Sequence, residues 1–288
     1  MKRLVLLFAI FSYTSYTYAQ KGIDYTLSDS TQVVTWLNLF QAQKSSKTSP
    51  QLWFAKRFLN RPYVAATLER NSTEQLVVNL REVDCTTFLN QALALTLAAR
   101  NPNSGFKDFC NFLTRLRYRN GKINGYASRL HYYSEAIADH IRNHMFKELG
   151  QDSSGKFPFT GVQTLHLNYM STHPQNYKQL KGNAQLTSQI AHYEKKLEGR
   201  TVYYIPVANL KRDRLLKPYV KDGDIIALVT NKKGLDISHL GFAVWIKGHL
   251  HLLNASSIHK KVVIEPMTLY QYMCKHPSQL GIRVIRLL

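Results

Sequence analysis

The chain has 288 residues, 44% of them hydrophobic, and its 38 Lys and Arg against 18 Asp and Glu give a formal net charge of +20 at pH 7. This composition supports a packed core and excludes a disordered or low-complexity chain. Beyond the first residues there is no second apolar run long enough to suggest a membrane span.

The N-terminus has the three-part pattern of a secretory signal peptide. A short positive segment, Lys2 and Arg3, precedes an apolar run, and small residues end at Ala19. The apolar run is too short to cross a bilayer, and the alternative to a signal peptide is a partly buried N-terminal helix. We expect residues 1–19 to be a signal peptide and residues 20–288 to form a single exported domain. The expected compartment is the periplasm, with no stable membrane insertion after cleavage.

Export also bears on what the positive charge can bind. Lys and Arg are scattered through the sequence rather than gathered in one segment, so we expect no nucleic-acid partner. An anionic polymer of the cell envelope fits the charge better, because a basic surface raises the local concentration of such a substrate. A solubilising surface that needs no partner is the alternative, and the sequence leaves the oligomeric state open.

The first half of the chain has apolar residues at helical spacing. We expect helices over residues 31–43, 50–60, 85–100 and 106–118, and in a stretch that ends at Gly150. Asp84 is a suitable N-cap for the helix that begins at Cys85. Residues 61–70 predict a loop, and residues 151–182 give mixed signals with a turn around Pro174.

The last third of the chain changes to short runs rich in β-branched and aromatic residues. We expect strands over residues 201–207, 224–230, 237–246, 249–256 and 261–266, separated by Gly-containing breaks. Short breaks of this kind predict an antiparallel meander. Helices followed by strands indicate an α+β fold, without an internal repeat or a convincing linker to a second domain.

The position of one cysteine points to chemistry. Three cysteines are an odd number, so at least one thiol should be free. A disulfide between Cys110 and Cys274 is less favoured than two reduced thiols, because a chain of this length needs no covalent link to fold. Cys85 follows Asp84 at the first turn of a helix, where the partial positive charge of the helix N-terminus lowers the pKa of a thiol. This position favours a nucleophile, whereas a structural cysteine would fit equally well in the middle of the apolar run.

A cysteine nucleophile needs an imidazole and a group that orients it. His239 lies in a predicted strand on the same face as Gly241, Ala243 and Trp245, which leaves space beside the ring. The next strand supplies Asn254 as the orienting group. The order Cys, His, Asn is that of papain. Spacing alone is a weak signal, since a buried cysteine and a structural histidine are the commoner reasons for such residues.

Several longer pieces carry a family resemblance. They are PYVAATLE, EQLVVNLREVDCTTF, GYASRLHYYSE, YMSTHPQNY, YIPV, KDGDIIALVTNKKGLDISHLGFAVW and LLNASS. In this order they resemble the N-acetylmuramoyl-L-alanine amidase-like family of the NlpC-type, papain-fold peptidoglycan hydrolases, over roughly residues 23–288. Asp-Cys-x-Thr-Phe together with Ser-His-x-Gly-Phe is the specific part of the match.

This resemblance implies a papain-like (NlpC-type) core with the nucleophile at a helix N-terminus, packed on an antiparallel sheet. It implies hydrolysis of the amide bond between N-acetylmuramic acid and L-alanine in peptidoglycan or muropeptides. Cys85 would be the nucleophile and His239 the base, with no cofactor and no metal. The sequence departs from the family pattern at Asn254, where many members carry His before Ala-Ser. Asn254 can still orient an imidazole by accepting its N–H.

Five further residues are candidates for substrate binding. Tyr63 and the loop SRLHYY, residues 128–133, would form the wall of the cleft, with Tyr132 stacking on a sugar or closing the cleft. Ser238 is a further candidate. Arg129 could pair with a stem-peptide carboxylate in a bidentate fork; alternatively Arg129 caps a loop and Tyr132 belongs to the core. Asp84 is a substrate anchor or, as we favour, a helix cap.

Other functions remain to be weighed. His140 and His144 lie four apart on a predicted helix, as in zinc amidases, but Ile141 stands where a His-Glu-x-x-His motif needs Glu. A Gly-x-Ser-x-Gly elbow is absent. A D-glutamyl stem-peptide endopeptidase would use the same Cys85 and His239. A non-catalytic peptidoglycan-binding protein is the alternative from another class.

Overall fold

The computed structural model describes residues 22–43, 48–153 and 155–288. The expected signal peptide, residues 1–19, lies outside the described residues. Within the described ranges no helix is both long enough and apolar enough to cross a membrane.

The α-helices are α1 (Leu27–Ala42), α2 (Pro50–Lys56), α3 (Cys85–Ala98), α4 (Phe106–Arg117), α5 (Tyr133–Arg142), α6 (Tyr169–Thr172), α7 (Ala184–Lys195), α8 (Val207–Leu210), α9 (Asp213–Leu216) and α10 (Leu269–Cys274). The strands are β1 (Ile23–Asp24), β2 (Leu76–Val77), β3 (Phe146–Glu148), β4 (Gly161–Thr164), β5 (Thr201–Pro206), β6 (Ile225–Thr230), β7 (Ile237–Ile246), β8 (His249–Ser256), β9 (Lys261–Ile264) and β10 (Gln279–Leu287).

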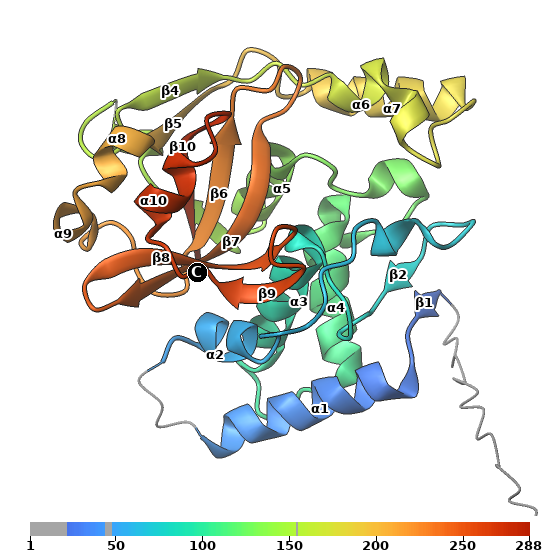
Figure 1. The fold of residues 1–288 in the computed structure, drawn as a ribbon. Coiled ribbons are helices and arrows are strands. Elements are labelled where there is room, and N and C mark those ends of the chain that lie inside the picture. Colours follow the sequence, from blue (N-terminus) through green and yellow to red (C-terminus); the bar gives the residue numbers. More distant parts are fainter. Residues whose placement is uncertain (1–21, 44–47, 154) are drawn as a thin grey trace, which may run out of the picture.

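Most of the strands belong to one antiparallel sheet. Its order is β4-β5-β10-β6-β7-β8-β9, and β3 pairs with β10 as well (Figure 1). The predicted meander is confirmed for β6 to β9, which are neighbours in sequence and in space. It is wrong for β5, because β10 lies between β5 and β6. The α+β class is confirmed.

The sequence did not predict β10, which is buried along most of its length. Arg283 lies at its centre with 2% of its surface exposed. Its Nε donates to Glu148 at 2.5 Å and its Nη1 donates to the Ser134 hydroxyl at 2.5 Å. A buried charge is tolerated only with such partners. Because these partners are 135 and 149 residues away in sequence, the local pattern gives no sign of a central strand.

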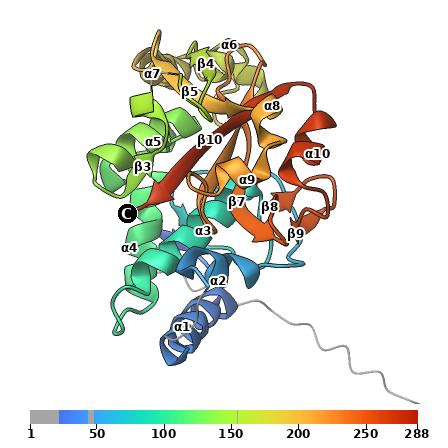
Figure 2. The ribbon, with the colours of Figure 1, turned by 90° about the vertical axis from the view of Figure 1, so that its left-hand side faces the viewer.

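Helices α2 and α3 pack against one face of the sheet, while α1 and α4 pack on the outside of α3 (Figure 2). All residues from 87 to 98 of α3 are buried, as expected for a helix that is apolar all round. The Phe88 ring meets the Phe242 ring of β7 edge to face, with the centroids 5.7 Å apart. This packing fixes the N-terminus of α3 against β7, because both rings are fully buried.

The other face of the sheet packs against α8, α9 and α10 (Figure 2). The predicted alternation along β7 is confirmed by the two cores. Leu240, Phe242 and Val244 belong to the helical core on one side, while Ala243 and Trp245 belong to the core on the other.

In the middle of the chain one prediction is wrong and one helix was missed. The helix expected to run to Gly150 ends at Arg142, because the chain turns to form β3 beside β10. Helix α7 was not predicted; together with α6 it builds a third core around Tyr132, Met170 and Ile190. The mixed signals of residues 151–182 reflect short elements separated by turns.

Candidate active site

Cys85 occupies the first position of α3, as predicted, and Asp84 is the N-cap. The Asp84 carboxylate accepts the backbone N–H of Thr87 at 2.7 Å, and the Thr87 hydroxyl accepts the N–H of Asp84 at 2.9 Å. This reciprocal capping box satisfies two donors that a helix start leaves unpaired. Asp84 is therefore a helix cap, which is the role we favoured over that of a substrate anchor.

His239 and Asn254 are joined directly. His239 lies on β7 and Asn254 on β8, and His239 Nε2 is 2.8 Å from Asn254 Oδ1. Asn254 is 0% exposed, so it cannot touch a substrate from this position. A side chain at Gly241 would collide with the backbone of β8 and with the Asn254 Cβ, so glycine is required for this close approach. The expected pairing of an orienting amide with the imidazole is thus present.

The sequence reasoning missed the group behind Asn254. Asn254 Nδ2 donates to Glu265 Oε1 at 2.9 Å, and Glu265 is 1% exposed. A carboxylate only accepts hydrogen bonds, so it fixes the amide with Nδ2 towards Glu265 and Oδ1 towards His239. His239 Nε2 must then carry the proton, which leaves Nδ1 for the thiol. The available signal was a Glu within the β-rich segment 261–266.

The second oxygen of Glu265 has a partner of its own. His259 Nε2 lies 3.2 Å from Glu265 Oε2, and the His259 side chain is 39% exposed. The row of side chains from His239 through Asn254 and Glu265 thus ends at a histidine that reaches solvent. Glu265 is held from two sides, which keeps the Asn254 amide in one orientation.

Cys85 and His239 line the same cavity. Its volume is about 120 Å³. It is lined by the start of α3, by residues 130–133, which lead into α5, and by residues 235–240, which lead into β7. Asn254 is not part of the lining. The cavity therefore presents a thiol and an imidazole to a bound group while the orienting residues stay behind the wall.

The protonation of the pair differs from the expectation for Cys85. Burial and the nearby Asp84 carboxylate raise the pKa of the Cys85 thiol to about 12, against the lowering by hydrogen bonds from Thr86 and Leu240. This direction is opposite to the lowering of the pKa expected from the helix N-terminus. Burial also lowers the pKa of His239, although Asn254 and Glu265 act to raise it. Both shifts favour a neutral thiol beside a neutral imidazole in the free protein.

Two of the predicted substrate-binding residues lie beside this pair. Ser238 lines the cavity, is exposed, and donates from its hydroxyl to Leu228 O at 3.3 Å. Tyr63 is half-buried and pairs with Val83, just before Asp84. Burial, followed by the charges of Cys85 and Asp84, raises the pKa of the Tyr63 hydroxyl to about 12. Ser238 thus lines the cavity of the nucleophile, whereas Tyr63 lies near Cys85 but is not among the lining residues.

Arg129 and Tyr132 have partners inside the protein instead of free faces. The Arg129 guanidinium contacts Glu69 and donates to Glu74 at 2.6 Å and 3.1 Å, and the residue is 7% exposed. The Tyr132 hydroxyl donates to Glu194 at 2.7 Å. The substrate clamp expected for Arg129 is therefore replaced by internal ion pairs. Tyr132 keeps an edge on the cavity, but its ring belongs to the third core.

Two further cavity residues are His131, which belongs to the predicted wall loop, and Asp236, which the sequence reasoning missed. His131 Nε2 lies 3.0 Å from Tyr126 O, and burial lowers the pKa of this histidine to about 3. Asp236 accepts the backbone N–H of Ser134 at 2.6 Å, at the start of α5. Both side chains are tied to their surroundings, so they form rigid walls rather than mobile groups.

The histidines of the zinc-amidase hypothesis do not line this cavity. His140 is buried in α5 against Phe146, and burial lowers its pKa to about 4, whereas His144 is exposed. Across the described ranges, no group of three or more His, Cys, Asp or Glu is placed to hold a metal ion. All three cysteines are free thiols, with Cys110 buried and Cys274 exposed.

Known proteins resemble this chain over most of its length. The family model described as N-acetylmuramoyl-L-alanine amidase-like matches residues 53–282. A solved N-acetylmuramoyl-L-alanine amidase from Bacteroides uniformis is 39% identical, with a TM-score of 0.77, over 83% of this chain and 99% of that one. A structure from Bacteroides fragilis, provisionally named a xylanase, is 46% identical, with a TM-score of 0.75, over 81% of this chain and 98% of that one.

A more distant structure, from Legionella pneumophila, is 22% identical with a TM-score of 0.66 over 91% of this chain and 96% of that one, and it shows a shared fold only. A search of curated proteins returned no match. The family model spans well over half of the residues, and the Bacteroides structures agree with the observed helices and antiparallel sheet. The chain belongs to the N-acetylmuramoyl-L-alanine amidase-like family.

Proposed function

We propose that the protein is an exported, periplasmic cysteine amidase with a papain-like arrangement of helix and sheet. It hydrolyses the amide bond between N-acetylmuramic acid and L-alanine in peptidoglycan or muropeptides. The observation that carries this proposal is the shared cavity of Cys85 and His239, with Asn254 bonded to the far side of the imidazole. The family match supports the substrate class, and the Bacteroides uniformis amidase supports the bond.

The reaction begins from the neutral pair. As Cys85 Sγ attacks the lactyl carbonyl carbon, His239 Nδ1 takes the thiol proton, so a free thiolate is not needed. The imidazolium then gives this proton to the departing nitrogen of L-alanine, and a thioester of the muramoyl group remains on Cys85. Water attacks the thioester, again with His239 as base, and restores the thiol.

The groups behind His239 assist when it becomes charged. The charge of the Glu265 carboxylate, which holds the Asn254 amide, opposes the lowering of the His239 pKa by burial. It therefore stabilises the imidazolium that forms during attack. We assign positioning roles to Asn254 and Glu265, since neither contacts the cavity.

The size of the cavity restricts what enters it. About 120 Å³ is well below the roughly 300–1,000 Å³ of a pocket that encloses a drug-sized ligand. The cavity can hold one small group beside the scissile bond, such as the methyl of L-alanine, while sugar and peptide extend along the surface. The endopeptidase alternative would place a different part of the stem peptide at the same thiol.

The provisional xylanase name of one relative calls for other chemistry. Glycoside hydrolysis ordinarily needs two carboxyl groups flanking the bond. Asp236 is the single carboxylate among the cavity residues, and its Oδ2 is occupied by the N–H of Ser134. The cavity therefore supports an amidase rather than a glycosidase.

Products from one defined substrate test the bond. With a disaccharide-tetrapeptide, mass spectrometry should show an intact peptide that begins with L-alanine. The same peptide without its sugar should not be cut, because the lactyl carbonyl supplies the acyl group. A muramoyl-L-alanyl-D-glutamate product would refute the amidase and assign the endopeptidase.

A further inference from the structure

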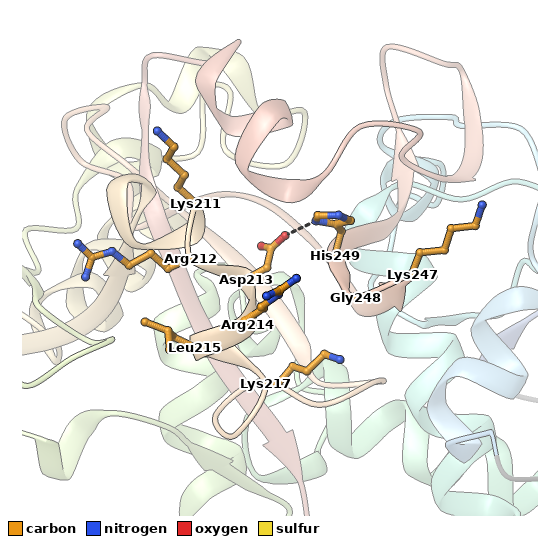
Figure 3. A pocket seen from close by; sticks show the side chains of 9 residues that line it. All are labelled: Lys211, Arg212, Asp213, Arg214, Leu215, Lys217, Lys247, Gly248 and His249. Carbon is orange, nitrogen blue, oxygen red and sulfur yellow. Dashed lines mark hydrogen bonds and ion pairs between the residues drawn. The ribbon is translucent and has the colours of Figure 1, made fainter.

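A second and larger pocket lies far from the thiol. Its volume is about 680 Å³, within the range of ligand sites, and it lies between α9 with its flanking residues and the turn that joins β7 to β8 (Figure 3). The lining includes five cationic side chains against one carboxylate, Asp213. The cationic residues, which we call the basic rim, are Lys211, Arg212, Arg214, Lys217 and Lys247.

The one carboxylate does not neutralise the basic rim. Asp213 Oδ2 is 2.8 Å from His249 Nδ1, and Figure 3 shows this pair between the cationic side chains. Over the described part of the chain, no ion pair joins a rim residue to an acidic group. Without acidic partners, the basic rim has unbalanced positive potential that an anion would relieve.

The pair of Asp213 and His249 also ties together the two segments that carry the charges. It links α9 to the first residue of β8, and the hairpin turn at Lys247 and Gly248 is tight, with both residues at positive φ. Lys217 lies over the ring of Trp245, with the amino group 5.7 Å from the ring centroid. Cationic side chains from two separate segments thus line one pocket.

The distance from the active site indicates what the pocket can hold. His239 lies near the start of β7 and Lys247 directly follows its last residue, so the two are eight residues apart, which is about 26 Å of extended strand. A ligand of the basic rim therefore lies well beyond the scissile bond and the small cavity around it. A monomeric muropeptide clamped at the thiol needs no contact there, whereas a polymer reaches both places.

We propose that the basic rim binds carboxylate groups of the peptidoglycan polymer at a distance from the bond being cut. This proposal rests on the proposed function for its choice of polymer. Guanidinium and ammonium groups bind carboxylates and phosphates alike, so the shared chemistry is that of a multivalent anion. Stem-peptide carboxylates are the source that the substrate itself carries.

Binding to isolated peptidoglycan sacculi tests the rim without requiring hydrolysis. The variant Arg214→Gln/Lys217→Gln/Lys247→Gln should bind sacculi about tenfold more weakly, since three exposed ion contacts together give an effect of this order. Binding of the unsubstituted protein should weaken as salt is raised. Turnover of a soluble disaccharide-tetrapeptide should stay unchanged, because that substrate does not reach the rim.

A matched control separates the rim from net charge. Lys107→Gln/Lys122→Gln/Lys147→Gln removes the same charge from exposed positions outside the pocket and should bind like the parent. Equal losses in both triple variants would overturn the proposal. Competition by poly-γ-glutamate supports carboxylate recognition, whereas competition by polyphosphate alone would overturn the assignment to stem peptides. A protein that binds through the rim but releases no product would refute the proposed function and leave this one intact.

Discussion

The two ends of β7 carry two different kinds of pocket. At one end, a cavity of about 120 Å³ contains a thiol and an imidazole whose partners are buried and fixed by hydrogen bonds. At the other end, a hollow of about 680 Å³ is lined by exposed cations with few protein partners. Bond cleavage requires reacting atoms held within fractions of an ångström, whereas attraction of an anionic polymer requires charge and reach. One strand therefore joins a precise site to a permissive one.

Loss of the nucleophile should have the largest effect and should separate the two ends most clearly. Cys85→Ser should lower turnover by about 10³-fold or more, since a hydroxyl is a far weaker nucleophile beside His239. Its binding to sacculi should remain that of the parent. Cys274→Ser, at an exposed thiol, serves as the control and should keep full activity. Parent-like turnover in Cys85→Ser would end the cysteine mechanism.

Loss of the orienting amide should come next. Asn254→Ala removes the group that fixes the His239 ring, so kcat should fall by about 10²-fold, with little change in KM because Asn254 is buried behind the wall. Asn254→His should restore most of kcat if Nδ1 or Nε2 accepts the same proton. Steady-state kinetics on the soluble muropeptide distinguish these cases. An unchanged kcat in Asn254→Ala would move the orienting role to another residue.

A smaller effect is expected from the carboxylate behind the amide. Glu265→Gln removes a charge that raises the pKa of His239, so this pKa should fall further below its ordinary value of about 6.5. Activity needs the neutral imidazole and is lost as the pH falls through that pKa. The acid limb of kcat/KM should therefore move to lower pH, with kcat reduced by about tenfold at neutral pH. An acid limb that stays in place would remove Glu265 from the mechanism.

The smallest effect on rate is expected at Arg129, where the effect on stability is large. Arg129→Ala removes the cationic partner of the buried Glu74 and leaves it, within the described residues, only the Tyr118 hydroxyl; breaking a buried ion pair typically costs about 3–5 kcal/mol of unfolding free energy. Denaturant unfolding should show this loss, while KM at a temperature where the variant is folded should change less than twofold. A tenfold rise in KM with unchanged stability would restore the clamp expected from the sequence.

Local patterns were enough to predict the parts of the site that depend on neighbours in sequence. Asp84 and Cys85 precede an apolar run, and the alternation along β7 fixes which side chains share a face with His239. The long-range partners could not be predicted in this way. Glu74 lies 55 residues from Arg129, and it decides whether that guanidinium is free.

The same limit applies to protonation and to the sheet. The sequence pattern correctly predicted Cys85 at a helix N-terminus. The pKa of its thiol, however, depends on burial, to which residues of β7 contribute. Likewise, the sequence does not predict β10 as a central strand, because the partners of its buried Arg283, Glu148 and Ser134, are distant in sequence. In the sequence the Lys and Arg residues are scattered, and those of the basic rim form one group only because α9 and the β7–β8 turn come together in the folded chain.

The central place of β10 has a consequence for when activity arises. Residue 85 is synthesised early, but Arg283 of β10 holds Ser134, and Ser134 in turn binds Asp236 in the cavity wall. Until residues 279–287 have left the ribosome, β5 and β6 lack the strand between them, and the wall lacks this anchor. The nascent chain thus carries its nucleophile without a finished cavity, and we expect no hydrolytic activity until β10 has been added.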